Sequence, residues 1–131
     1  MATPTIVVPS HWKPFYDSTG IPAAVRVGAE LTVTGHTGDT AEGYEPDVAT
    51  QLRQTFRNLT ETLLEAGMGW PDVVEITSYH VGLGAQSRIL LEIVGEFMQP
   101  PLPAWTAVGV VALFDAEALV EVSCRAVSHS H

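Results

Sequence analysis

The last well-patterned stretch of the chain, residues 118–127, alternates between apolar side chains and polar or charged ones. The apolar members that recur at every second position are Val120, Val122, Cys124 and Ala126. A period of two residues is typical of a strand that has one face on a hydrophobic core and the other face open. The pattern therefore predicts a half-buried strand, and it places Glu121 on the face that the core does not cover.

Four further segments have the composition of strands. Residues 24–27 and 31–34 flank the short connection Gly28-Ala29-Glu30, which predicts a β-hairpin. Residues 73–81 alternate in the same way as the last strand, and residues 106–113 form another run of β type. The chain is therefore expected to contribute five strands, of which the last two follow each other closely.

Two segments have a helical period. Apolar residues recur at spacings of three and four in the first segment, at Val48, Leu52, Phe56, Leu59 and Leu63. This stripe predicts an amphipathic helix that begins near Asp47 and ends at Gly67. Residues 86–98 predict a second helix, and the pair Pro100-Pro101 prevents it from continuing.

The resulting order of elements, β-β-α-β-α-β-β, predicts an α+β fold. One mixed sheet with two helices on one face is the natural architecture for that order. The full chain, residues 1–131, is long enough to form a single domain with its own core, and residues 128–131 are expected to be a tail. Because nothing in the chain covers the second face of the sheet, we expect a closed homo-oligomer.

Residues 1–20 lack any period and contain three prolines, so we expect an extended N-terminal arm. The arm carries four large side chains, those of His11, Trp12, Phe15 and Tyr16. Packing is the simpler role for such a group, and lining a ligand site is the alternative.

The charge balance and the cysteine count limit the partners and the compartment. Six Lys+Arg against fifteen Asp+Glu give a formal charge of −9, which disfavours nucleic acid, because nucleic-acid affinity depends largely on cationic side chains. The single cysteine, Cys124, excludes an internal disulfide. Since the sequence has no signal-peptide pattern and no apolar run near the ~18 residues of a membrane span, we expect a cytoplasmic protein without a membrane partner.

Few residues have the spacing of a catalytic or metal-binding motif. The five histidines form no metal-ligand pattern, and no phosphate or dinucleotide motif is present, so we expect neither a metal nor a cofactor. Glu121 remains as a candidate, because one carboxylate in a cleft can hold and polarise a water. A solvated edge carboxylate is an equally open interpretation. Similarly, residues 35–38, Gly-His-Thr-Gly, are either an ordinary turn or a ligand-binding loop.

Six short motifs follow one another at consistent distances from about Ala23 to Val127. They are Ala24-Val25-Arg26-Val27-Gly28, Val33-Thr34-Gly35, Glu65-Ala66-Gly67, Asp72-Val73-Val74, Pro103-Ala104-x-Thr106-x-Val108 and Leu119-Val120-Glu121-Val122. In this order they resemble the RidA (YjgF/YER057c/UK114) family and its chorismate-mutase-like fold. The resemblance implies a homotrimer around a central barrel, with small-molecule clefts between neighbouring subunits.

The resemblance also implies an activity and its residues. Members of the best-known type hydrolyse reactive 2-imino and enamine acids to 2-oxo acids and ammonia. In that type an arginine directly after the Pro-Ala pair binds the substrate carboxylate, and a glutamate of the last strand positions the attacking water. Glu121 falls on that glutamate, and Thr34 with Gly35 falls on the hydroxyl residue and the glycine of a Ser-Gly-Gln loop.

Four other lining positions depart from that pattern. Trp105 stands in place of the arginine, Ala107 in place of a cysteine, His36 in place of the loop glutamine, and Ile21 near an early tyrosine. Losing the charged pair would weaken carboxylate binding by ~2–5 kcal/mol, because indole offers one N–H and no charge. The candidates for a replacement cation are Arg26, Arg88, Arg125 and His36.

These departures favour an enamine or imine deaminase with an altered substrate preference. A non-catalytic small-molecule-binding or regulatory trimer is the alternative. Endoribonuclease activity, a label that members of this family also carry, is disfavoured by the acidic charge balance and by the lack of a His/Lys cluster for acid–base chemistry.

Overall fold

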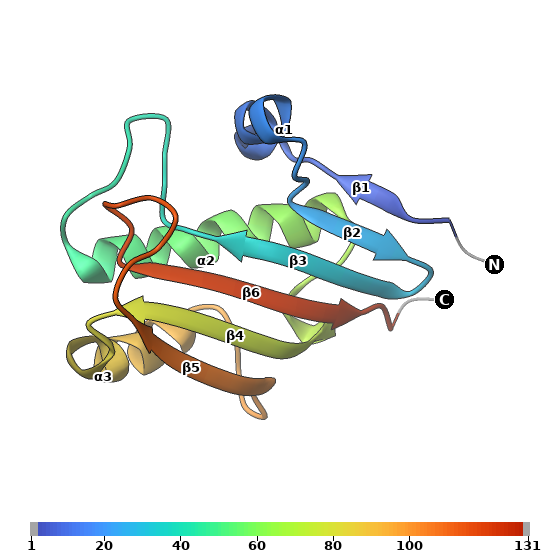
Figure 1. Ribbon diagram of the computed structural model, residues 1–131. Coiled ribbons are helices and arrows are strands. Elements are labelled where there is room, and N and C mark those ends of the chain that lie inside the picture. Colours follow the sequence, from blue (N-terminus) through green and yellow to red (C-terminus); the bar gives the residue numbers. More distant parts are fainter. Residues whose placement is uncertain (1–2, 130–131) are drawn as a thin grey trace.

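The computed structural model describes residues 3–129 and contains one six-stranded sheet in the order β1-β2-β3-β6-β4-β5 (Figure 1). The strands are β1 Thr5–Val7, β2 Ala24–Val27, β3 Glu30–His36, β4 Val73–Val81, β5 Ala104–Val110 and β6 Val120–Val127. Neighbours are antiparallel except β4 and β5, which run parallel because the helix α3 (Leu83–Val94) lies on the connection between them. The predicted mixed sheet is confirmed, with one more strand at its N-terminal edge.

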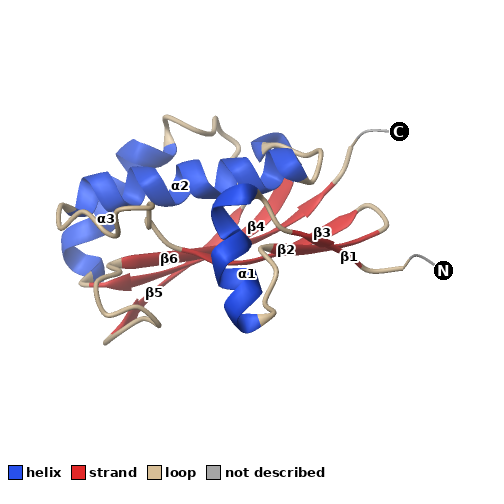
Figure 2. Cartoon of the chain, turned by 90° about the horizontal axis from the view of Figure 1, so that it is seen from above, coloured by secondary structure: helices blue, strands red, loops and turns tan. Residues whose placement is uncertain are grey.

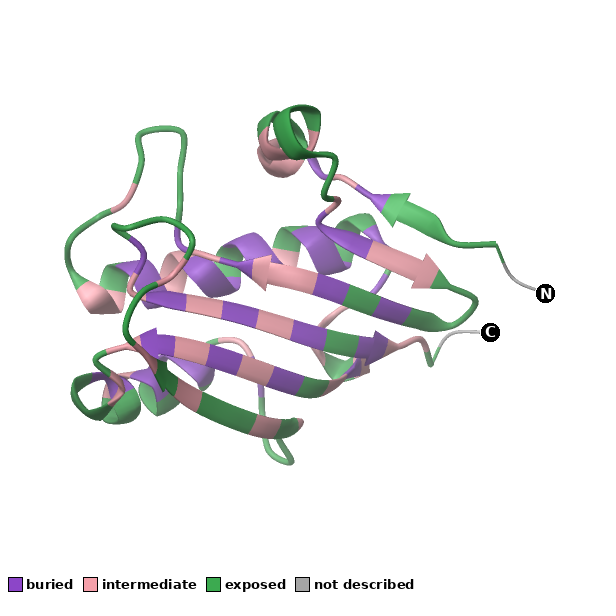
Figure 3. Ribbon diagram, in the orientation of Figure 1, coloured by how far each residue is buried: buried purple, intermediate pink, exposed green. Residues whose placement is uncertain are grey.

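Helices α2 (Val48–Glu65) and α3 pack on the same face of this sheet (Figure 2). The predicted stripe of α2 forms the centre of the core, where Leu52, Phe56, Leu59 and Leu63 are at most 1 % exposed. These side chains pack against the apolar face of β6, along which buried and partly exposed residues alternate (Figure 3). Each large apolar side chain buried in this way contributes about 1.5–3 kcal/mol. This layer therefore packs the apolar face of β6 against α2, while β3 and β4 pair with its two edges.

Several element boundaries differ from the sequence prediction, and helix α3 also ends earlier than expected, at Val94 rather than at residue 98. Helix α3 begins three residues earlier than expected, because Gly82 adopts a left-handed conformation (φ 83°) and turns the chain directly from β4 into the helix. Strand β5 ends at Val110 rather than at residue 113. Val110 pairs with Val81, the last residue of β4, so the chain beyond Val110 has no strand beside it.

The expectation of an extended N-terminal arm is wrong. After β1, which pairs with β2, the chain forms a 3₁₀ turn (Ser10–Trp12) and a third helix, α1 (Lys13–Thr19). The indole N–H of Trp12 donates to the carbonyl of Ile21 at 2.9 Å and ties this turn to the segment before β2. Helix α1 stands beside the edge of the sheet, close to the end of β3 (Figure 1).

Two loops, residues 37–47 and 111–119, project from the same end of the sheet (Figure 1). The buried side chain of Gln51 holds both of them. Its Nε2 donates to the carbonyls of Glu45 (2.8 Å) and Glu117 (2.9 Å), and its Oε1 accepts from the N–H of Leu119 at 2.9 Å. Gln51 of α2 thus holds the backbone of both loops. The second of these loops leads into β6, in which Glu121 lies two residues after Leu119.

The helices α2 and α3 leave the other face of the sheet open in the single chain (Figure 2). On that face Arg125 lies 3.3 Å from Glu30 and 3.5 Å from Glu75, so polar contacts as well as short apolar side chains occupy it. No helix within residues 3–129 combines the length and the apolar character needed to cross a membrane.

Candidate functional site

A β-bulge near the end of β3 builds the candidate site. Val33 pairs with Cys124 and His36 pairs with Val122, so three steps along β3 correspond to two along β6. Both Val33 and His36 are therefore buried on the side of the helices, while Thr34 and Gly35 lie between them in the irregular stretch. Bulges of this kind redirect side chains and are frequent beside active sites.

The bulge corrects the expectation that His36 lies in a loop and lines a ligand. His36 is the last residue of β3 and is 1 % exposed. Its Nδ1 lies 2.6 Å from the carbonyl of Thr34 and its Nε2 lies 2.7 Å from Oγ1 of Thr62. Because a carbonyl only accepts, Nδ1 carries the proton and Nε2 accepts from Thr62. Burial, the largest cause, lowers the pKa of His36 to about 4, so the imidazole is neutral and supports the bulge from behind.

Glu121 lies on the opposite side of the bulge, against Gly35. A β-carbon at position 35 would fall 2.5 Å from Oε2 of Glu121, so the carboxylate occupies the space that any larger residue would fill. Glycine in a strand often marks such a close approach. The two positions that the resemblance assigned separately, Gly35 and Glu121, thus lie directly beside each other in this chain.

Glu121 and Gly35 line a cleft of about 390 Å³. The 3₁₀ turn and α1 contribute one wall, with Trp12 and Phe15, and the loop 111–119 contributes Phe114. The cleft also includes Ile21, Thr19, Thr34, Thr37 and His11, together with two further acids, Asp39 and Asp115. The sequence pattern gave no indication of Asp115 or Phe114, because they lie in a loop without any period. Of the four large side chains noted before β2, His11, Trp12 and Phe15 line the cleft, whereas Tyr16 does not. Both expected roles occur together, because Trp12 also packs against the ring of His36 at 4.5 Å.

The carboxylate of Glu121 is half-buried and has no hydrogen-bond or ion-pair partner within residues 3–129. Burial raises its pKa above the ordinary value for glutamate, and the nearby charge of Asp115 raises it further. A carboxylate that faces a cleft with a raised pKa and no structural partner is typical of a group that exchanges protons with a ligand or a water.

Asp115 has a fixed position beside Glu121. Its Oδ2 accepts from the hydroxyl of Tyr44 at 2.6 Å, and the same hydroxyl lies 2.8 Å from Oγ1 of Thr37. Burial, together with the hydrogen bond to Asp115, raises the pKa of Tyr44 well above its ordinary value, so Tyr44 remains a donor. These contacts join the loops 37–47 and 111–119 across the mouth of the cleft.

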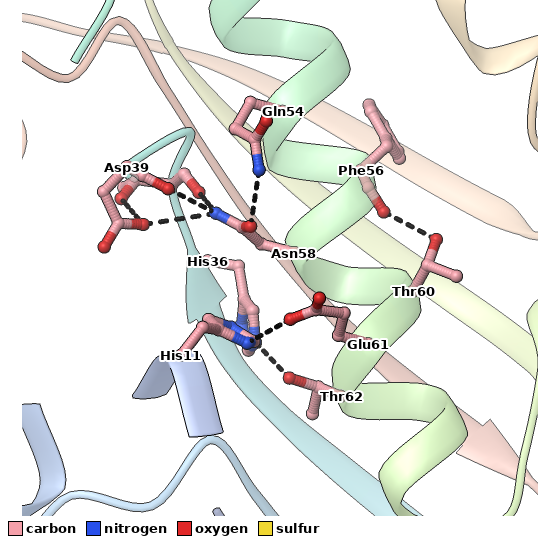
Figure 4. A network of polar contacts seen from close by, with 10 residues as sticks. His11, His36, Asp39, Gln54, Phe56, Asn58, Thr60, Glu61 and Thr62 are labelled. Carbon is pink, nitrogen blue, oxygen red and sulfur yellow. Dashed lines mark hydrogen bonds and ion pairs between the residues drawn. The ribbon is translucent and has the colours of Figure 1, made fainter. Parts of the chain in front are cut away.

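Helix α2 supports the cleft through two polar side chains, the buried Asn58 and the exposed Glu61 (Figure 4). Nδ2 of Asn58 donates to the carbonyls of Thr37 (2.9 Å) and Asp39 (3.0 Å), which holds the loop after β3. One turn further along α2, Oε2 of Glu61 lies 2.7 Å from Nδ1 of His11 (Figure 4). The acidic and polar residues of α2 therefore anchor both the loop and the N-terminal segment that line the cleft.

Trp105 does not line the cleft that contains Glu121 in this chain. Its indole N–H donates to Oγ of Ser78 at 2.9 Å on the helix-covered face, and its ring lies 6.2 Å from that of Phe56. The chain of hydrogen bonds continues, because Oγ of Ser78 lies 2.8 Å from Nε2 of His80 and Nδ1 of His80 lies 2.9 Å from Oε1 of Gln86. The single donor of Trp105 is therefore used internally.

The predicted site residues thus divide into two groups. Ile21, Thr34 and Gly35 line one cleft together with Glu121. Trp105, Ala107 and His36 do not line it, since Trp105 and Ala107 lie on β5 beside Ile76 and Ser78 of the core face and His36 lies behind the bulge. Within residues 3–129, no group of three or more acidic, His or Cys side chains has the arrangement of a metal site.

The geometry defines a class: an α+β chain with one mixed sheet, and a partly buried carboxylate beside a bulge in a small aromatic cleft. A family model described as Endoribonuclease L-PSP matches residues 20–128. The chain is 38 % identical over 127 residues to the RutC family protein YjgH of Escherichia coli K12, covering 95 % of this chain and 97 % of that protein. The chain belongs to the RidA (YjgF/YER057c/UK114) family, as its motifs predicted.

Solved structures agree with this assignment. The structure titled Protein YJGH superposes with a TM-score of 0.86 at 35 % identity and covers 97 % of this chain and 98 % of that one. Rv2704 from Mycobacterium tuberculosis, described as a member of the YjgF/YER057c/UK114 family, gives a TM-score of 0.81 at 28 % identity, over 96 % of this chain and all of that one. RidA from an Antarctic Psychrobacter gives 0.78 at 26 % identity, over 82 % and 88 % of the two chains.

Proposed function

We propose that this protein hydrolyses a reactive imine or enamine to a carbonyl compound and ammonia, with Glu121 as the proton-transferring residue. The observation that carries the proposal is the carboxylate of Glu121, which faces the cleft without a partner within residues 3–129. Its raised pKa supports an acid–base role, and its position matches the glutamate that the family resemblance assigns to the attacking water.

The proposed reaction has two steps. Glu121 accepts a proton from a water molecule whose oxygen bonds to the imine carbon, while the C=N electron pair moves to the nitrogen, which takes up a proton from the solvent. In the resulting carbinolamine, the protonated Glu121 returns its proton to the nitrogen. The C–N bond then breaks, ammonia leaves, and the hydroxyl group releases its proton to the solvent as the carbonyl forms. The sum is one imine and one water giving one carbonyl compound and one ammonia.

We further propose that the active form is a homotrimer. The open face of the sheet and the unpaired edge of β5 are the surfaces that copies of the chain would cover. In such an assembly a neighbouring subunit would complete the cleft beside Glu121. Native mass spectrometry tests this proposal, and a purely monomeric species would contradict it.

A second candidate function is ligand binding without turnover. It is favoured by Trp105, which replaces the family arginine and whose only donor is already bonded to Ser78. Ribonuclease activity fits less well, because Asp39, Asp115 and Glu121 would face the phosphates of an RNA in this cleft.

The deciding experiment measures ammonia release from imines generated in situ. A flavin-dependent amine oxidase supplies arylalkyl imines, and an amino-acid oxidase supplies 2-imino acids. We expect the protein to accelerate release from at least one class, and we expect Glu121→Gln to lose a factor of ~10²–10⁴, the usual contribution of general acid–base catalysis. Glu92→Gln, an exposed carboxylate of α3, is the matched control and should keep full activity. A protein that accelerates no imine, or a Glu121→Gln variant with unchanged rate, would contradict the proposal.

A further inference from the structure

The cleft beside Glu121 contains acidic side chains and no lysine or arginine. Three carboxylates line it, those of Asp39, Asp115 and Glu121. The chain has six Lys+Arg in all, and the structure describes every one of them. None of the six lines the cleft, so within a single chain nothing there offers a permanent positive charge to a ligand.

Most of these cations are held elsewhere by specific contacts. Arg26 donates to the carbonyls of Gly28 (2.9 Å) and Ala66 (2.6 Å), where it caps the end of α2. The others with ionic partners form the pairs Lys13–Asp17, Arg53–Glu96 and Arg125–Glu30. Arg57 and Arg88 lie on the helices α2 and α3. The candidates that the sequence offered as substitutes for the missing arginine therefore do not reach the cleft of their own chain.

The walls of the cleft are aromatic. The rings of Trp12 and Phe15 meet edge to face with centroids 5.3 Å apart, and Phe15 meets Phe114 in the same way at 6.3 Å. These three rings come from the 3₁₀ turn, from α1 and from the loop 111–119, so they bring two distant parts of the chain together around one cavity. Phe114 is 83 % exposed in the single chain although it is fully apolar, which leaves its ring available to a ligand.

Aromatic faces combined with carboxylates form a binding environment for organic cations. The electron-rich face of an aromatic ring attracts a cation, and a carboxylate attracts it further, whereas both repel an anion. A ligand carboxylate would be a fourth negative charge in a cavity of about 390 Å³. The overall charge of −9 acts in the same direction by raising the local concentration of cations and lowering that of anions.

We infer that the substrate or ligand of this cleft is an arylalkyl or alkyl imine or amine that lacks a carboxylate and carries its positive charge on nitrogen. This inference rests on the proposed function for the site and specifies its substrate class. The ring or alkyl chain packs against the rings of Phe15 and Phe114, and the nitrogen lies toward Asp115 and Glu121. The cleft thus favours a cationic ligand, whereas an arginine beside the site would favour an anionic one.

Three probes with the same phenylethyl group test the inference on the native, full-length protein. They are 2-phenylethylamine, which is cationic at pH 7, the neutral 2-phenylethanol, and the anionic 3-phenylpropanoate. Binding is followed by isothermal titration calorimetry and by the fluorescence of Trp12, with Trp12→Phe identifying its share of the signal. We expect the amine to bind at least tenfold more tightly than the anion, with the alcohol between them, and we expect added salt to reduce the difference.

Charge-removing variants then assign the selectivity to the cleft. Asp115→Asn keeps an oxygen that can accept from Tyr44, and it should reduce the preference for the amine by a factor of three or more. Glu92→Gln removes one charge outside the cleft and should leave the preference unchanged. Equal or tighter binding of the anion, or binding of none of the three probes, would overturn the inference.

The catalytic assay separates this inference from the proposed function. Cation-selective binding without ammonia release from any imine would contradict the proposed function and leave the ligand class standing. Rapid hydrolysis of 2-imino acids in preference to arylalkyl imines would support the function and overturn the ligand class.

Discussion

Gly35 and Glu121 form a contact that leaves no room for a side chain at position 35. A β-carbon there would lie 2.5 Å from Oε2 of Glu121 and 2.8 Å from its Cγ and Cδ atoms. The bulge in β3 and the glycine within it therefore determine where the carboxylate lies. The backbone of β3 thus sets the position of the carboxylate on the neighbouring strand β6.

Gly35→Ala should lower activity much more than stability. The added methyl group displaces the carboxylate of Glu121, whereas the backbone at position 35 has no left-handed strain to oppose the change. A misplaced catalytic group costs about 10² in rate. We expect kcat for ammonia release to fall by about this factor while Tm changes by only a few degrees.

Gly84→Ala is the matched control for that substitution. Gly84 lies in α3 with open space around the position of its missing β-carbon, so alanine should stabilise the helix by about 0.5–1 kcal/mol and leave the rate unchanged. If Gly35→Ala keeps the wild-type rate, the close contact with Glu121 does not position the carboxylate for catalysis.

The pH dependence of the rate should report the environment of Glu121. A general base acts in its ionised form, so the rate falls as the pH drops through the pKa of this group. Because burial and Asp115 raise that pKa, the acid limb of the kcat/KM profile should lie above the ordinary glutamate value of about 4.3. Asp115→Asn removes one of the two causes and should move the limb to lower pH. A limb that stays in place in Asp115→Asn would show that Asp115 does not act on Glu121.

The sequence predicted the framework of this fold well because its signals are local and periodic. The alternation in residues 118–127 identified the buried face of β6, and the stripe from Val48 to Leu63 identified the packing face of α2. Both patterns repeat over many residues, so a single exception does not obscure them. Helix α1 is only seven residues long and carries no such repeat, which is why the sequence suggested an extended arm in its place.

The side-chain directions within the site were harder to predict. The bulge adds one residue to β3, and a shift of one residue sends every following side chain to the other face, so His36 is buried where a loop residue was expected. Motif positions identified Trp105 as the counterpart of an arginine, but they carry no information about where its side chain points. Its contact with Ser78 depends on the parallel pairing of β4 and β5, which joins residues far apart in the chain.

Protonation of His36 should destabilise the fold at acid pH. In the unfolded chain histidine has a pKa of about 6.5, whereas burial lowers the pKa of His36 in the folded chain to about 4. Between these two values the unfolded state binds a proton that the folded state does not, so the free energy of unfolding falls as the pH falls through this window. Below about pH 4 both states are protonated, and this contribution stops changing.

Urea titrations at several pH values between 7.5 and 4 test this prediction. His36→Gln cannot take up the proton, so its free energy of unfolding should change less with pH through this window. At pH 7.5 the variant should be less stable than wild type by about 1–3 kcal/mol, because glutamine pairs the buried groups around it imperfectly. His129→Gln replaces an exposed imidazole that bonds Asp72 and serves as the comparison. Parallel curves for His36→Gln and wild type would exclude His36 as the source of the acid sensitivity.

Removing the indole N–H of Trp105 should destabilise the protein through the hydrogen-bond chain that it begins. Trp105→Phe keeps an aromatic ring near Phe56 and leaves Oγ of the buried Ser78 without its donor. An unsatisfied buried acceptor costs about 1–3 kcal/mol, which chemical denaturation can measure. Trp12→Phe is the matched control, because Trp12 donates to the carbonyl of Ile21 at an exposed site where water can replace it. We therefore expect Trp105→Phe to lower the free energy of unfolding more than Trp12→Phe does. Equal losses would mean that the hydrogen bonds that link Trp105, Ser78, His80 and Gln86 contribute no more to stability than one exposed hydrogen bond.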